Sequence, residues 1–348
     1  MIEKILSYAR TENCSDVHLT HNMPPIMRKL GNMIPINDVF PNLNIEKVIY
    51  DMLSDEQMQK VEKHVDIDFC YTMETGERQR VNVYYQQGHI CAALRLLNDK
   101  IPTIDELQLP KAFKQLAQMP NGLVLVTGPT GSGKSTSLAA VIDYINQNRK
   151  CHIITMEDPI EYLHPHKNSV VHQREVGSDC MDFGSALRSS LREDPDVILV
   201  GEMRDLETIS AAITAAETGH LVLSTLHTIG AADTINRIID VFPSGAKDQI
   251  RSQLSTCLRG VITQQLVPLA DQSARCAAFE VMLANEAVAN LIRENKCFQV
   301  NSVLQTTVKD GMFSLNYDLA RLVNMGKISL YDAMSKSTNR VELSKYLE

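Results

Sequence analysis

The stretch Leu123–Ile145, LVLVTGPTGSGKSTSLAAVIDYI, decides the fold class of this 348-residue chain. Its branched apolar residues predict a buried strand, and the segment after the glycines predicts a helix. Between the two stand Gly128, Gly133, Lys134 and Ser135 at the spacing of the Walker A pattern. A strand, a glycine-rich loop and a helix in this order predict an α/β domain that binds phosphate.

The loop predicts a nucleoside triphosphate and Mg²⁺ as ligands. Glycines let backbone N–H groups face phosphate oxygens, and the positive end of the helix dipole favours the anion. We expect Lys134 to reach the β and γ phosphates and Ser135 to bind Mg²⁺ through its hydroxyl. The alternative is a glycine-rich turn without a ligand, although all four motif positions match. The predicted nucleotide-binding residues are Gly128, Pro129, Thr130, Gly131, Ser132, Gly133, Lys134, Ser135 and Thr136.

The amino-acid composition narrows the classes of binding partner and the cellular compartment. The 34 Lys and Arg residues against 42 Asp and Glu give a net charge of −8, which argues against nucleic acid as a partner. The eight cysteines contain no C-x-x-C pair and suit reduced, cytosolic thiols. No apolar run approaches the roughly 18 residues that span a bilayer, and the N-terminus lacks a signal core. We therefore expect no direct membrane insertion, only contact through partners.

The chain is long enough for two domains. Residues 1–97 predict a small mixed domain, with a helix near 45–63 and strands at RQRVNVYY and HICAALRLL, and residues 98–110 predict a linker with two prolines. In 111–348 helical patterns alternate with apolar strands, which predicts a mostly parallel sheet with helices on both faces. Those strands are expected at 123–127, 152–156, 197–200 and 221–225.

Carboxylates follow one of the predicted strands. Glu157 and Asp158 end the strand at 152–156, and Glu161 follows in the turn. Ligands of α/β sheets bind at the carboxyl ends of strands, so these groups are expected to hold Mg²⁺ through water or to position the attacking water. The alternative makes Asp158 a turn residue before Pro159.

Gly201 follows the predicted strand at 197–200, at the position where an ordinary Walker B strand has aspartate. Glu202 is therefore the candidate for polarising the nucleophilic water and for contacting Mg²⁺ through a water. The alternative is an ordinary solvated carboxylate.

His220 and His227 flank the predicted strand at 221–225. A continuous strand would separate them by roughly 23 Å and aim them at opposite faces, so they cannot share one metal ion. His227 follows the carboxyl end of the strand, where it can sense the γ phosphate. His220 at the other end is equally consistent with a structural histidine.

Together these stretches resemble the retraction ATPases of type IV pili, within the larger family of secretion ATPases. The resemblance covers nearly the whole chain and implies a PAS-like N-terminal domain followed by a RecA-like P-loop NTPase domain. It rests on the collinear strings GPTGSGKST, EDPIE, QREVG, ALRSSLREDPDVILVGEMRDLETI, AAETGHLVLSTLHT and RIIDVFP.

By position, the resemblance assigns Glu202 as the catalytic glutamate, and it places Glu161 with its neighbours in an aspartate box and His220 and His227 in a histidine box. Arg80 and Arg95 match N-domain arginines that reach nucleotide, and the alternative for each is an ordinary strand-edge arginine. The helix pattern AVANLIRE resembles a retraction signature that has arginine at the place of Ala289.

The resemblance implies a homo-hexameric ATPase motor for pilus retraction, at the cytoplasmic face of the inner membrane. Its expected partners are the inner-membrane pilus platform protein and other pilus motor components. Within the same family, the alternative is a pilus assembly or type II secretion ATPase, which is commonly longer and often carries a tetracysteine module. A DNA translocase conflicts with the net charge of −8, and a nucleotide-binding regulator without turnover conflicts with Glu202.

Overall fold

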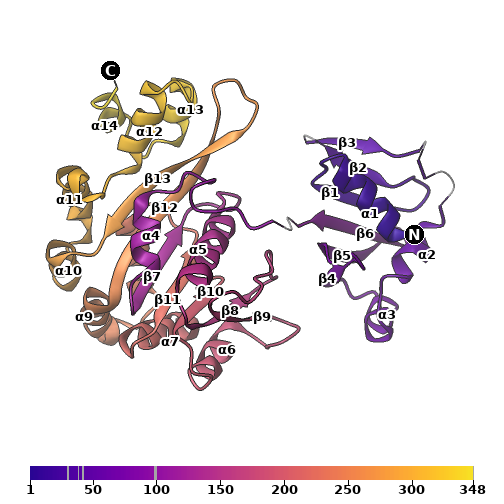
Figure 1. The fold of residues 1–348 in the computed structure, drawn as a ribbon, viewed down its shortest axis with the longest axis horizontal. Coiled ribbons are helices and arrows are strands. Elements are labelled where there is room, and N and C mark those ends of the chain that lie inside the picture. Colours follow the sequence, from indigo (N-terminus) through magenta and orange to yellow (C-terminus); the bar gives the residue numbers. More distant parts are fainter. Residues whose placement is uncertain (30, 38, 41–42, 98–99, 348) are drawn as a thin grey trace. The chain divides into compact units, whose positions relative to one another are not determined.

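The computed structural model describes residues 1–348 except 30, 38, 41–42, 98–99 and 348. The chain forms two compact units, Met1–Lys100 and Ile101–Glu348 (Figure 1). The expected linker at 98–110 stays a prediction, and its residues 98–99 lie outside the described residues. No helix within the described residues is both long enough and apolar enough to cross a membrane.

The first unit is built on an antiparallel sheet. Its described strands run in the order β3-β2-β1-β6-β5-β4. Alternate residues such as Val81 and Val83 are buried against the helices, because the side chains of a strand point to opposite faces. The strands are β1 (Asp16–Leu19), β2 (Ile26–Lys29), β3 (Asn32–Pro35), β4 (Ile67–Thr72), β5 (Arg78–Gln86) and β6 (His89–Leu96).

The helices of the first unit are α1 (Ile2–Thr11), α2 (Ile45–Tyr50) and α3 (Asp55–Val61). The sequence predicted one helix near 45–63, whereas the structure has two. Ser54 and Gln57 form a capping box in which each side chain accepts a hydrogen bond from the other residue's backbone N–H. Such a box starts a new helix, so the chain turns between α2 and α3.

The second unit contains a mostly parallel sheet. Its described strands have the order β13-β12-β7-β11-β10-β8-β9, and β12 and β13 pair antiparallel (Figure 1). Every residue of β7, β10 and β11 is buried, as expected for parallel strands covered on both faces. The strands are β7 (Gly122–Thr127), β8 (His152–Glu157), β9 (Val170–Glu175), β10 (Val197–Val200), β11 (Leu221–Leu226), β12 (Leu258–Pro268) and β13 (Arg275–Leu283).

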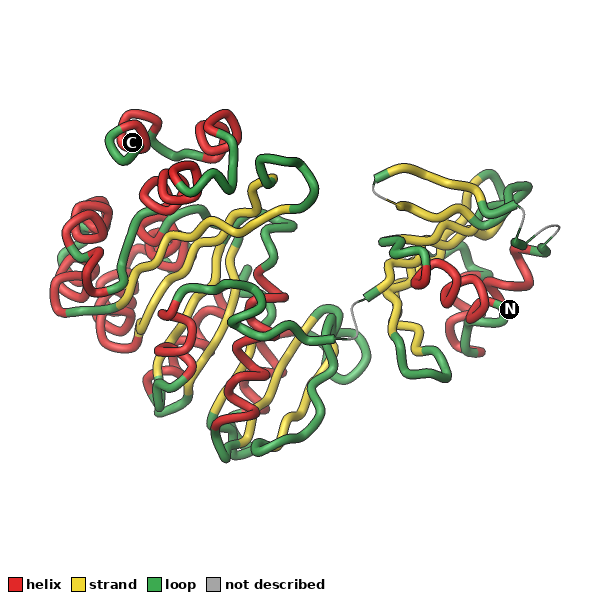
Figure 2. Tube along the Cα trace, turned by 45° about the horizontal axis from the view of Figure 1, so that its top comes forward, coloured by secondary structure: helices red, strands yellow, loops and turns green. Residues whose placement is uncertain are grey.

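Helices cover both faces of this sheet, as Figure 2 shows. One apolar core contains Phe113 and Ile142 from α4 and α5, and the other contains Ile213, Ile238 and Leu254 from α7, α8 and α9. The α/β prediction, with a small first domain and a mostly parallel sheet in the second, is confirmed. The helices are α4 (Lys111–Ala117), α5 (Lys134–Asn148), α6 (Phe183–Ser190), α7 (Leu206–Glu217), α8 (Ala231–Asp240), α9 (Lys247–Cys257), α10 (Glu286–Arg293), α11 (Val300–Thr306), α12 (Leu315–Asn324), α13 (Leu330–Lys336) and α14 (Arg340–Ser344), with short 3-10 turns η1 (Ser244–Ala246), η2 (Cys297–Gln299) and η3 (Val308–Asp310).

The β12–β13 hairpin joins the sheet to the C-terminal helices. Glu280 of β13 is 6% exposed, and burial raises its pKa. Its carboxylate accepts hydrogen bonds from the backbone N–H groups of Ala231 (2.8 Å) and Leu315 (3.4 Å), the first residues of α8 and α12. One buried side chain therefore caps two helices, and the helix dipoles favour its negative charge.

His164, between β8 and β9, gives the second unit an acid-sensitive position. Burial and, less strongly, the charge of Lys167 lower the pKa of His164 from 6.5 to about 4, although Asp143 opposes this shift. The unfolded chain then binds a proton in a pH range where the folded chain does not, so stability falls as the pH decreases from 6.5 toward 4.

We expect this histidine to cost the wild-type chain about 2 kcal/mol of unfolding free energy between pH 7.5 and pH 5. Over the same pH range, a His164→Gln variant should lose about 2 kcal/mol less unfolding free energy than the wild-type chain, because glutamine does not titrate. Urea denaturation of both chains at the two pH values measures the difference. Equal losses in both chains would contradict the assignment.

Candidate functional site

The phosphate loop follows the carboxyl end of β7 and leads into α5. Gly128, Gly131 and Gly133 have φ angles of +139°, +76° and +88°, a region that residues with a side chain rarely adopt. A Cβ atom at Gly128 would lie 2.1 Å from the carbonyl oxygen of Gln264, while one at Gly131 would meet no atom within 4 Å. Glycine is therefore required at Gly128 by packing as well as by its backbone angle, and Gly131 leaves open space beside the loop.

The loop holds donors that fit a phosphate group. Lys134 is only 8% exposed, and its Nζ donates to the carbonyl oxygens of Gly128 (2.8 Å) and Pro129 (3.1 Å). Burial lowers the pKa of Lys134, and the charges of Glu202 and Glu161 oppose this shift. Among the described residues, the buried hydroxyl of Ser132 has no hydrogen-bond partner. A buried cation and an unpaired hydroxyl in one glycine-rich loop are chemically suited to an anion.

Gln264 of β12 fixes the loop from the neighbouring strand. Its Nε2 donates to the carbonyl oxygen of Ser132 (2.8 Å), and its Oε1 accepts from the hydroxyl of Ser137 (2.8 Å). Beside it, the hydroxyls of Thr127 and Thr263 lie 2.8 Å apart. Sequence reasoning missed Gln264, although polar side chains inside the apolar run VITQQLV were a usable signal.

Glu202 follows β10 at the edge of the sheet that carries the loop. The N–H of Gly201 donates to the carbonyl oxygen of Met156 (2.8 Å), and a Cβ on Gly201 would approach that oxygen to 3.1 Å. A side chain on Gly201 would crowd the backbone of the neighbouring strand β8, which favours glycine over the usual aspartate. The side chain of Glu202 is 19% exposed and pairs with Arg204, a partner that the sequence motifs did not predict.

His227 links Glu202 to the tip of the phosphate loop. Its Nε2 lies 2.9 Å from the Glu202 Oε1, and its Nδ1 lies 3.5 Å from the Thr130 hydroxyl. The structure does not bring His220 to this edge. His220 precedes β11, and its Nδ1 lies 3.0 Å from the carbonyl oxygen of Ala215, so its role in nucleotide binding stays a prediction.

The carboxylates at and after the end of β8 lie in different environments. Glu157 accepts hydrogen bonds from the Thr155 hydroxyl (2.7 Å) and the Gln173 amide (3.1 Å), and burial raises its pKa. Glu161 is exposed, and its charge acts on both Lys134 and Glu157. Exposed Asp158 precedes a cis proline, and its charge acts on Arg204. The structure therefore brings Glu161 within electrostatic reach of the loop.

A cavity of about 1050 Å³ adjoins the loop within the second unit. Gly133, Thr136 and Ser137 line it where it meets the loop, next to Gln264. Cavities of roughly 300–1,000 Å³ hold small molecules and cofactors in proteins. Its apolar wall comes from Leu107, Leu109, Pro110, Leu266, Phe279 and Phe313.

Arg80 and Arg95 lie in the first unit, directly opposite each other on β5 and β6. Both are exposed, and each has an acidic neighbour. The Arg80 Nε lies 3.8 Å from Asp68, and the Arg95 Nε donates to Asp16 at 3.1 Å. Their expected contact with nucleotide stays a prediction.

Similar proteins cover almost the whole chain. The family model for type II/IV secretion system proteins matches residues 1–340. The type IV pilus retraction ATPase PilT of Pseudomonas aeruginosa is 46% identical over 97% of this chain and 98% of its own length, and the type IV pilus ATPase PilU of that organism is 38% identical over 98% and 90%. The crystal structure of the pilus retraction motor PilT with bound ADP superposes with a TM-score of 0.93 at 46% identity, covering 98% of both chains. The chain belongs to the type II/IV secretion system protein family, as the sequence motifs had predicted.

Proposed function

We propose that this chain is a subunit of an ATP-hydrolysing motor that drives pilus retraction. The observation that carries the proposal is the contact series from the loop tip at Thr130 through His227 to Glu202, at the edge of the sheet that holds the phosphate loop. In this proposal the series sets a carboxylate beside the bound phosphates, as ATP hydrolysis requires. The 46% identity to the PilT retraction ATPase supports pilus retraction as the work performed.

In this proposal, each residue of the site has its own role in hydrolysis. Backbone N–H groups at the start of α5 and the ammonium of Lys134 hold the phosphates. Glu202 accepts the proton of the attacking water, and His227 orients its carboxylate. Mg²⁺ would be held by the Ser135 hydroxyl and by Glu202 through water, and it would supply charge neutralisation at the phosphates.

The cavity beside Gly133 and Thr136 is proposed to take the nucleoside part of ATP. Residues of the phosphate loop line one part of it, and its apolar part includes Phe279 and Leu109, which suit the faces of a purine ring. Glu157, whose pKa is raised by burial, and Glu161 are proposed to position water on the other side of the loop.

The assembly is proposed to be a homo-hexamer that acts from the cytoplasmic face of the inner membrane on the pilus platform protein. Arg80 and Arg95 are exposed on the sheet of the first unit, so they can serve a nucleotide bound by another subunit. An arginine supplied in this way contributes about 10³–10⁵ in rate in other phosphoryl-transfer enzymes. The net charge of −8 argues against a nucleic acid as the moving partner.

Deletion of the gene in its own host tests the function. We expect cells with excess surface pili that have lost twitching motility, and recovery when the wild-type gene is returned. Electron microscopy of pili and a motility assay give the readouts. Cells without pili would instead assign the chain to pilus assembly, and unchanged pili would refute both functions.

A further inference from the structure

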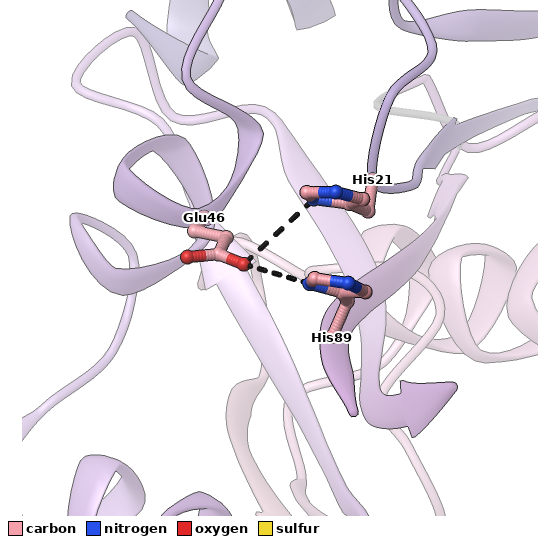
Figure 3. Close-up of side chains that lie close together, drawn as sticks. All are labelled: His21, Glu46 and His89. Atoms are coloured by element: carbon pink, nitrogen blue, oxygen red, sulfur yellow. Dashed lines mark hydrogen bonds and ion pairs between the residues drawn. The ribbon is translucent and has the colours of Figure 1, made fainter. Parts of the chain in front are cut away.

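Three side chains from distant parts of the sequence converge at one end of the first unit's sheet (Figure 3). His21 follows β1, Glu46 lies in the first turn of α2, and His89 is the first residue of β6. Across the part of the chain that the structure describes, they are the one group of three His, Cys, Asp or Glu residues whose ligand atoms all lie within 4.8 Å of one another. The group belongs to the first unit, and the phosphate loop belongs to the second.

The possible ligand atoms of the group lie close enough together to share a metal ion. The Glu46 Oε1 lies 3.3 Å from the Nδ1 of His89 and 3.9 Å from the Nδ1 of His21. The two imidazole rings are stacked, with centroids 3.5 Å apart and planes 4° apart. Ligand atoms about 2.1 Å from a tetrahedral Zn²⁺ lie roughly 3.4 Å from each other. The separations between Glu46 and the two histidines are therefore near those of a bound ion. Parallel rings cannot both point a nitrogen at one ion, so binding would require one imidazole to turn out of the stack.

We propose that His21, Glu46 and His89 form a binding site for a divalent transition-metal ion of the Zn²⁺ class. Two imidazole nitrogens and one carboxylate oxygen are ligands that zinc accepts, whereas Mg²⁺ prefers oxygen ligands in an octahedron. A cavity of about 620 Å³, lined by His21, Glu46, Asn22 and Asn44, adjoins the group. The cavity gives water access to a fourth coordination position.

A bound ion would tie three segments of the first unit together. The ligands belong to the turn after β1, to the start of α2 and to the β5–β6 hairpin, so the ion would bridge chain positions that only the fold brings near one another. A ligand that binds the folded state alone raises its stability by mass action. The site would therefore change the thermal stability of the first unit independently of nucleotide binding.

The test uses the full chain, stripped of metal with a chelator, free of nucleotide and titrated with Zn²⁺ in a calorimeter. We expect one Zn²⁺ per wild-type chain, at least 100-fold weaker binding for His21→Ala/His89→Ala, and a weakened site in Glu46→Gln. The Glu46→Gln variant keeps the side-chain volume, which guards against loss of folding. Zn²⁺ should also raise the unfolding temperature of the wild-type chain and leave that of the double variant unchanged.

The pair of His152 and His172 provides a matched control. These exposed histidines also touch each other, with the Nε2 of His152 2.8 Å from the Nδ1 of His172. His152→Ala/His172→Ala should keep the one tight site. Equal loss of binding in both double variants, or a wild-type chain that binds no Zn²⁺, would overturn the proposal.

Co²⁺ reports on the ligands directly, since its visible absorption is intense in four-coordinate sites. We expect such a spectrum in the wild-type chain, absent from the His21→Ala/His89→Ala variant and without a thiolate charge-transfer band. The charge-transfer band would instead assign the ion to some of the eight cysteines, and the proposal would fail.

Discussion

Replacement of Lys134 by alanine is expected to lower steady-state ATP turnover by roughly 10²–10³-fold and to weaken nucleotide binding. The side chain is the buried cation of the loop, held by the carbonyl oxygens of Gly128 and Pro129. Without it, the backbone N–H groups of the loop would have to hold the phosphates with no positive side chain to balance their charge. Phosphate release by the purified chain measures the loss.

Lys150→Ala is the matched control for this variant. Lys150 is an exposed lysine just beyond the other end of α5, so its removal takes away the same charge far from the loop. We expect the control to keep its turnover. Wild-type turnover in Lys134→Ala would show that catalysis takes place elsewhere, and equal losses in both variants would indicate a general effect of charge.

Glu202→Gln is expected to lower the rate of a single turnover by roughly 10²–10⁴-fold while nucleotide binding persists. Glutamine keeps the shape and the oxygen that faces His227 and Arg204, but its amide cannot take the proton of the attacking water. The variant should therefore retain ATP intact after mixing. Quenched-flow hydrolysis of bound ATP and chromatography of the retained nucleotide measure the two effects.

Glu207→Gln serves as the control for Glu202→Gln, since Glu207 is an exposed glutamate that pairs with Arg188 on the neighbouring helix. A change there should leave the single-turnover rate within about threefold of wild type, less than 1 kcal/mol of barrier. If Glu202→Gln also stayed within that range, another group would have to be the base.

The strands next to the loop were predictable because their residues are uniformly apolar. The expected strands at 123–127, 197–200 and 221–225 agree with β7, β10 and β11 to within a residue at each end. The hairpin of β12 and β13 was not foreseen, because polar residues such as Gln264 and Glu280 interrupt its apolar pattern. Those side chains are buried through hydrogen bonds to distant parts of the chain, and local periodicity carries no sign of such partners.

The candidate site was partly predictable for a similar reason. Glu202 and His227 each follow the carboxyl end of a strand, so the parallel order of the sheet predicted their common edge. Arg204 pairs with Glu202 in the irregular segment after β10, where no periodic pattern predicts which side chains meet. His21, Glu46 and His89 come from three separate segments, so their proximity is visible only in the folded chain.

The hairpin of β12 and β13 makes the loop and the C-terminal helices mechanically interdependent. On one strand Gln264 holds the backbone of Ser132, and on the other Glu280 holds Ala231 and Leu315, the first residues of α8 and α12. These bonds are buried, and each broken bond would leave an unpaired polar group at a cost of about 1–3 kcal/mol. A displacement of Ser132 that preserves them must shift the start of α12 as well, so the orientation of the C-terminal helices reports the position of the loop.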